Sequence, residues 1–132
     1  MIGVEIAAVV ILLVTGLANG LPIVGVVGAR RLAGLYGVPI TDPGLLVLMR
    51  HRAVLLGLLG AALVGAAFVP SWRLPAMVAG LASMLAFVAL ASTTSGPKIR
   101  TTAVVDVVLS VALAVALVLH LLADGTAATT PR

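Results

Sequence analysis

The sequence predicts an all-α fold: a polytopic membrane four-helix bundle with a short interfacial helix between the first two spans. Two observations predict this class. Of the 132 residues, 62% are hydrophobic and 9% are charged, whereas soluble domains contain roughly 45–50% apolar and 25% charged residues. The apolar residues also form four runs long enough to cross the ~30 Å hydrocarbon core of a bilayer. We therefore expect a single integral membrane domain over residues 1–132.

The first span is expected over about 2–20. It ends there because Pro22 lacks a backbone N–H donor and interrupts a helix. The next segment, about 24–38, contains the basic pair Arg30 and Arg31 among apolar residues. This pattern is typical of a short amphipathic helix that lies at the membrane interface.

The other three spans are expected over about 44–69, 75–92 and 102–123. The second begins after Asp42-Pro43, where a polar capping residue is followed by a proline in the first turn. The connection from the second span to the third is very short. These two spans should therefore form an antiparallel hairpin.

Basic residues are distributed unequally between the two ends of the predicted spans. Arg73 and Arg132 are expected on one side. The opposite side receives the other six: Arg30, Arg31, Arg50, Arg52, Lys98 and Arg100. The positive-inside rule places the larger group in the cytoplasm, so both termini should lie outside it. Because these charges flank apolar runs and form no basic face on a soluble element, we expect no nucleic-acid partner.

Polar residues recur at helical spacing on one face of the first span and on one face of the fourth. The polar face of the first span carries Glu5 and Asn19. The polar face of the fourth span carries Asp106, Ser110 and His120. Polar groups are costly in hydrocarbon unless they find partners, so both faces should point inward. Because the two helices run in opposite directions, two polar layers are expected.

The inner polar layer is predicted to contain Asn19, Arg50, His51, Arg52, Asp106 and Ser110, and the outer layer Glu5 and His120, with Arg73 as a candidate third member. We expect Asp106 to pair with the basic run 50–52, because an unpaired carboxylate inside a helix destabilises by a few kcal/mol.

Most of these residues also have a purely structural interpretation, which for Asp106 is the pairing itself. The basic run 50–52 can anchor the chain to headgroups and set its topology. Glu5 can be solvated at the interface, and His120 can be a helix-end residue. Asn19 can satisfy backbone groups freed by Pro22.

Small residues recur in the second span at strict four-residue intervals. They are Ala53, Gly57, Ala61 and Gly65. Small residues let helix backbones approach closely in membranes. We therefore expect these four to form a helix-packing stripe.

The sequence contains no recognisable catalytic or metal-binding constellation. It has no cysteine, which excludes disulfides, zinc–thiolate sites and haem attachment through C-x-x-C-H. Its two histidines, His51 and His120, are expected in opposite polar layers, so they cannot share a haem or metal within a monomer. Phosphate-binding loops, nucleophile elbows and H-E-x-x-H motifs are also absent. We expect no cofactor and no metal site.

Several stretches resemble small four-helix bacterial membrane proteins of a broadly DoxX-like kind: Ala29–Val38, Asp42-Pro43, Arg50–Ala61, Ala79–Met84 and Val104–Asp106. The resemblance implies a place in the bacterial cytoplasmic (inner) membrane and an association with redox-linked membrane complexes. Some proteins of this kind are named phosphopantetheine adenylyltransferase. That activity needs a soluble nucleotide-binding fold and a paired-histidine motif, and this sequence has neither.

Three functional hypotheses follow. The first is a non-catalytic accessory or binding subunit of a membrane complex, in contact with membrane lipid and with a copy of itself or a larger membrane protein. The alternative is a proton-coupled or lipophilic-substrate transporter, in which Asp106 or Glu5 is the protonatable group. The third is a membrane enzyme that acts on a lipid or quinone, with His51 as acid or base.

Overall fold

The computed structural model describes the backbone of residues 2–128 and the side chains of residues 2–125, and within that range it is all-helical, with no strand. The elements in chain order are α1 (Ile2–Gly20), the 3₁₀ helix η1 (Leu21–Val27), α2 (Ala29–Tyr36), α3 (Pro43–Phe68), the 3₁₀ helix η2 (Pro70–Trp72), α4 (Arg73–Ala91) and α5 (Pro97–Ala128). Four of these segments are long and apolar enough to cross a membrane: α1 with η1, α3, η2 with α4, and α5. The predicted all-α class is confirmed.

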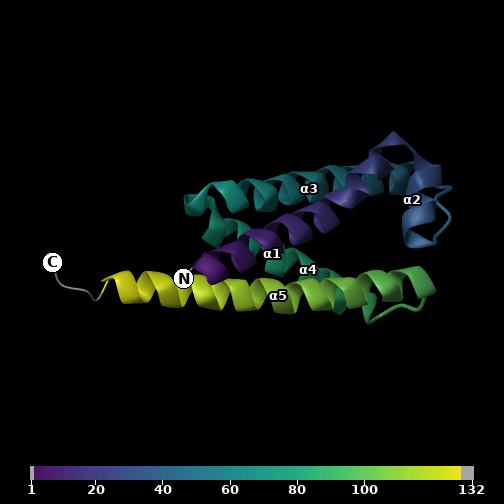
Figure 1. Cartoon of the computed structure of the whole chain (residues 1–132). Helices are drawn as coiled ribbons and strands as arrows, with labels where there is room; N and C mark the ends of the chain where they lie inside the picture. The colour runs from purple at the N-terminus through teal and green to yellow at the C-terminus, as the bar shows by residue number, and fades with distance from the viewer. Residues whose placement is uncertain (1, 129–132) are drawn as a thin grey trace.

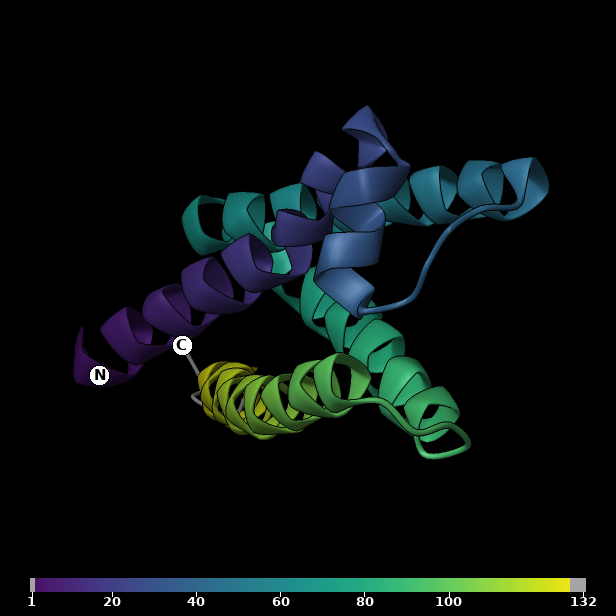
Figure 2. The same cartoon turned by 90° about the vertical axis from the view of Figure 1, so that its right-hand side faces the viewer.

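The long helices pack as two tight pairs, α1 with α3 and α4 with α5, and these pairs meet through contacts of α3 with α4 and of α1 with α5. Figure 1 shows α2 and the first turns of α3 and α5 at one end of the molecule, which we call the α2 end. The start of α1 and the last turns of α3 lie toward the opposite end, which we call the η2 end. Figure 2, which looks nearly along α5, shows α3 and α4 inclined to that helix.

Local sequence explains where several helices begin and end. The Asp42 carboxylate accepts a hydrogen bond of 2.7 Å from the Leu45 N–H and so caps α3, as its sequence predicts. The chain leaves α2 at Gly37, whose φ of 68° is a left-handed conformation that glycine adopts without strain. Helix α5 begins at Pro97, five residues before the expected span, because a proline fits the first turn, where no N–H partner is needed.

The segment 24–38 differs from the single interfacial helix that was expected there. It consists of the end of η1 and of α2, separated by Gly28 in an extended conformation. Pro22 lies within η1, so the chain passes from α1 directly into a tighter helix. The segment packs against α3 and contacts the start of α5.

The core lies between α1, α3, α4 and α5, and on α3 it is formed by residues of the last two turns. Its buried residues are Leu12, Leu63, Ala66, Ala67, Ala76, Met77, Met84, Leu113 and Ala116. Outside this core most large apolar side chains are exposed. On α1, for example, Ile6, Val10, Val14 and Leu17 form an outward apolar face.

The closest approach of α1 and α3 is made by Gly16 and Gly60. A Cβ atom on Gly60 would lie 2.5 Å from the carbonyl oxygen of Gly16 and 2.7 Å from the backbone nitrogen of Gly20. A Cβ on Gly16 would lie 2.8 Å from the carbonyl oxygen of Gly60. Backbone atoms cannot move aside as side chains can, so this contact requires glycine on both helices.

The predicted stripe of small residues on α3 is only partly a helix-packing surface. Ala53 is buried, Gly57 faces Ile23 of η1, and Gly65 faces the Trp72 ring. Ala61 is exposed, so it is not among the residues that are buried by contacts within the chain. Steps of four residues drift by about 40° around a helix of 3.6 residues per turn, whereas a step of seven nearly restores the direction. Gly60, seven residues after Ala53, therefore takes the place expected of Ala61.

Replacing Gly60 with Ala should destabilise the protein by about 1–3 kcal/mol, because the added methyl group forces the backbones of α1 and α3 apart. Helix propensity alone would favour the substitution, so a loss of stability reports the close contact. The matched control is Gly3→Ala, since a Cβ at Gly3 meets nothing within 4 Å. Thermal unfolding in detergent, followed by circular dichroism, measures both variants. Equal unfolding temperatures for Gly60→Ala and Gly3→Ala would contradict the contact.

Candidate functional site

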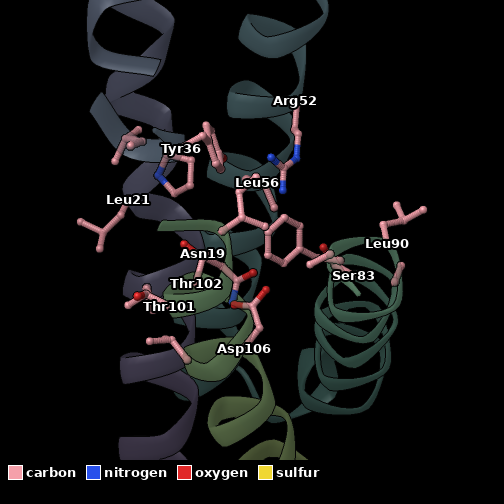
Figure 3. A pocket seen from close by; sticks show the side chains of 18 of the residues that line it. Asn19, Leu21, Tyr36, Arg52, Leu56, Ser83, Leu90, Thr101, Thr102 and Asp106 are labelled. Carbon is pink, nitrogen blue, oxygen red and sulfur yellow. The ribbon is translucent and has the colours of Figure 1, made fainter. Parts of the chain in front are cut away.

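A cavity of about 720 Å³ lies at the α2 end, between the two helix pairs. Its walls come from the end of α1, from η1 and α2, from the first half of α3, from the second half of α4 and from the first turns of α5. Most of the lining is apolar. The polar lining residues are Asn19, Tyr36, Arg52, Ser83, Thr94, Thr101, Thr102 and Asp106. Figure 3 shows how most of these side chains lie around the space.

Two aromatic rings hold Arg52 at the cavity wall. The guanidinium carbon lies 4.9 Å from the ring centroid of Tyr36 and 5.0 Å from that of Phe87. A cation at this distance from a ring face is attracted by the ring quadrupole. The two contacts join α2, α3 and α4, and they turn the guanidinium toward the cavity.

Asp106 faces the same cavity from α5 and is half-buried. Within the part of the chain that the structure describes, no hydrogen bond or ion pair reaches its carboxylate. The ion pair expected with the run 50–52 is therefore not formed. Figure 3 shows the Arg52 guanidinium and the Asp106 carboxylate directed into the cavity from different walls.

The rest of the basic run lies outside the cavity. Arg50 and His51 are exposed, and neither belongs to the cavity lining. Consecutive residues point about 100° apart around a helix, so three in a row cannot share one direction. Arg52 is therefore the one residue of this run that lines the same cavity as Asp106.

Of the remaining members of the predicted inner layer, one lines the cavity and one does not. Asn19 lines the cavity, and its side-chain amide donates a hydrogen bond of 3.0 Å to the Thr15 carbonyl. Ser110 lies one turn deeper than Asp106, is buried outside the cavity lining, and has no hydrogen-bond partner for its hydroxyl among the described residues. The structure therefore brings together Asn19, Arg52 and Asp106, and it leaves Ser110 in the core.

The environment of Tyr36 is polarised by both charges of the cavity. Burial raises the pKa of the Tyr36 phenol above its ordinary value, the positive charge of Arg52 lowers it, and the negative charge of Asp106 raises it. The pKa of the Tyr36 phenol therefore responds to the charges of both Arg52 and Asp106. The chain contains no other tyrosine.

The residues of the predicted outer layer meet at the η2 end. An Nη atom of Arg73 lies 3.3 Å from a carboxylate oxygen of Glu5, with Arg73 buried and Glu5 exposed. His120 Nε2 lies 3.6 Å from a carboxylate oxygen of Asp124, one turn along α5. Glu5, Arg73 and His120 line a second cavity of only about 40 Å³. This cavity is too small for an organic ligand, and the ion pair links α1 to α4.

The sequence predicted an interfacial segment over 24–38, which contains Tyr36, but did not connect Tyr36 with Phe87 or Arg52. Each of the three belongs to a different element, so no local spacing relates them. The one available signal was the rarity of aromatic residues, which make up 3% of the chain. Among the described residues, no group of three or more histidine, aspartate or glutamate side chains is close enough to hold a metal ion.

No protein-family model, curated protein or solved structure matches this chain.

Titration of the single tyrosine tests the geometry of the cavity. The pKa of Tyr36 should lie above the ordinary value of about 10, rise further in Arg52→Gln, and fall in Asp106→Asn. Tyrosinate absorbance in detergent measures it, with exposed Arg50→Gln as the matched control. Because the folded state favours the neutral phenol, this stabilisation is complete below the ordinary tyrosine pKa and is lost as pH rises through the folded value. An unchanged titration in both cavity variants would contradict the arrangement.

Proposed function

We propose that the chain is a small integral membrane protein whose four spans form a helical bundle, and that it is a non-catalytic binding module for an amphiphilic molecule taken from the bilayer. The membrane location is supported by the four apolar helices and by their outward apolar faces. Such faces are costly in water and cost nothing in lipid. Helix α4, with 19 residues, is about 28 Å long, close to the ~30 Å of hydrocarbon.

The proposed orientation places the α2 end in the cytoplasm of a bacterial cell and both termini outside it. Six basic residues belong to α2 and to the first turns of α3 and α5, all at the α2 end. Lys98 also ties this end together, because its ammonium donates a hydrogen bond to the Gly34 carbonyl and its stem lies against Gly37. Arg73 is the basic residue at the η2 end within residues 2–125.

The binding role is carried by one observation, the cavity with apolar walls and two charged groups. Ligand sites are typically concave, mostly apolar and supplied with a few polar groups that fix orientation. A volume of about 720 Å³ falls within the range of about 300–1,000 Å³ that such sites occupy. An accessory subunit of a DoxX-like complex would use such a module to hold a lipophilic component beside a partner or a second copy.

Transport is a weaker candidate. The two cavities lie at opposite ends, and the core between them contains fully buried Leu12 and Leu113. Binding from the side of the α2 end needs no route through this core. Transport would require it to open.

The absence of cysteine allows a direct test of orientation. Ser71→Cys in η2 and Ser95→Cys in the loop before α5 are both at exposed positions. A membrane-impermeant maleimide should label Ser71→Cys in intact cells, and it should label Ser95→Cys only after permeabilisation. The reverse pattern would overturn the orientation, and equal labelling of both in intact cells would contradict a spanning hairpin.

Filling the cavity should abolish binding. Ser83→Trp places an indole at the cavity wall, and Ala82→Trp places the same group at the adjacent exposed position outside the lining. Native mass spectrometry of protein released from nanodiscs of a total bacterial lipid extract measures the retained amphiphile. We expect wild type and Ala82→Trp to retain it and Ser83→Trp to lose at least about tenfold in occupancy, equivalent to about 1.4 kcal/mol. Wild-type protein that retains no amphiphile would refute the proposed function.

A further inference from the structure

The cavity contains one positive and one negative group that form no direct ion pair with each other. Arg52 makes contacts with the rings of Tyr36 and Phe87, and no ion pair of its guanidinium is present among the described residues. Asp106 has no hydrogen-bond donor there. Ring faces do not use the N–H groups at the edge of a guanidinium. The N–H groups of Arg52 therefore remain available as hydrogen-bond donors on one side of the open space. On the other side, the Asp106 carboxylate can accept hydrogen bonds.

Charge complementarity selects the occupant. An anion would satisfy Arg52 but would be repelled by Asp106, and a cation would have the opposite problem. A charge in apolar surroundings is costly unless it is paired and hydrogen-bonded. A zwitterion, with its anionic and cationic groups on one short linker, satisfies both walls at once.

The chemistry of Arg52 and of Asp106 then indicates which anionic group and which cationic group the ligand carries. A guanidinium presents parallel N–H donors that match the oxygens of a phosphate. A carboxylate accepts hydrogen bonds, so it favours a primary ammonium over a quaternary one, which has no N–H. The aromatic rings that would attract a quaternary ammonium already hold Arg52.

Position in the membrane matches a lipid headgroup. Phe87 lies four residues before Ala91, the last residue of α4, which is about 6 Å along the helix axis. Because α4 is about as long as the hydrocarbon is thick, the guanidinium stacked on Phe87 lies near the headgroup level of one leaflet. Free solutes are not concentrated at that level, whereas phospholipid headgroups are.

The cavity wall is also continuous with the lipid-facing surface. Leu55 on α3 and Leu90 on α4 both line the cavity, yet they are 51% and 70% exposed. Acyl chains can therefore leave sideways past these two leucines into the bilayer. A water-soluble ligand would gain nothing from this apolar exit.

We propose that the cavity binds one zwitterionic phospholipid that carries a primary ammonium, of the phosphatidylethanolamine class. Its phosphate lies against Arg52, its ammonium against Asp106, and its acyl chains pass Leu55 and Leu90. This inference rests on the proposed binding function and names its ligand class.

The test is headgroup competition with the wild-type protein. The protein is placed in nanodiscs that contain equal amounts of phosphatidylethanolamine, phosphatidylcholine and phosphatidylglycerol with identical acyl chains, and the lipid retained after release is identified by native mass spectrometry. We expect phosphatidylethanolamine to be enriched about tenfold or more over each competitor. Addition of water-soluble glycerophosphoethanolamine at equal concentration should displace none of it, and displacement would overturn the assignment to a lipid.

Two substitutions test which headgroup contacts Asp106 and Arg52 make. Asp106→Asn should remove the preference for phosphatidylethanolamine and favour anionic phosphatidylglycerol, because only the positive charge remains. Arg52→Gln should lower retention of all three phospholipids about tenfold. Arg50→Gln, an exposed position on the same helix outside the lining, should behave as wild type. Circular dichroism and size-exclusion chromatography verify that each variant is folded, and the wild-type competition needs no variant.

The outcomes separate this inference from the function on which it rests. Retention of no lipid of any class by wild type would refute both. Enrichment of phosphatidylglycerol, or of a lipid without phosphate, would refute the zwitterionic ligand and leave the binding function standing. Equal retention of phosphatidylcholine and phosphatidylethanolamine would refute the contact between a primary ammonium and Asp106.

Discussion

Apolar surroundings make an unpaired charge or hydrogen-bonding group costly, and this constraint explains the placement of most polar side chains in the molecule. Arg73 is buried where it can reach Glu5, Lys98 reaches a backbone carbonyl, and the Asn19 amide bonds back to its own helix. The buried hydroxyls of Thr15 and Ser110 are exceptions, because they have no hydrogen-bond partner among the described residues. Asp106 is a charged exception. Its carboxylate faces open space together with Arg52, so a ligand can remove the cost of leaving it unpaired.

Close packing at the centre and separation at one end create that space. Gly16 and Gly60 bring α1 and α3 into backbone contact near the core, and α4 and α5 form the other tight pair. Beyond the core, η1 and α2 pack against α3 and cover the α2 end. Because α2 is short and is held by Lys98, it can close one side of the cavity and still leave the leucine-lined side open.

Composition and proline positions were sufficient to predict the helical class and the start of α3, since these depend on local chemistry. The spatial relations were harder. Ala61 was expected to pack because of its four-residue spacing, and the drift of the helix places Gly60 at the contact with α1 within the chain. Asp106 was expected to pair with the basic run 50–52, but Arg52 is held by two aromatic rings that are distant in sequence. No single-sequence pattern reports such contacts between elements.

The dry core gives the two ends different roles. Between the cavity at the α2 end and the small one at the η2 end, Leu12 and Leu113 are fully buried, and the nearby hydroxyls of Thr15 and Ser110 have no hydrogen-bond partner in the described part of the chain. Such a layer offers a charged headgroup no favourable step from one end to the other. A zwitterionic occupant that enters past Leu55 and Leu90 therefore stays in the leaflet from which it came. The Glu5–Arg73 pair at the far end then holds α1 against α4 and does not act as a second binding site.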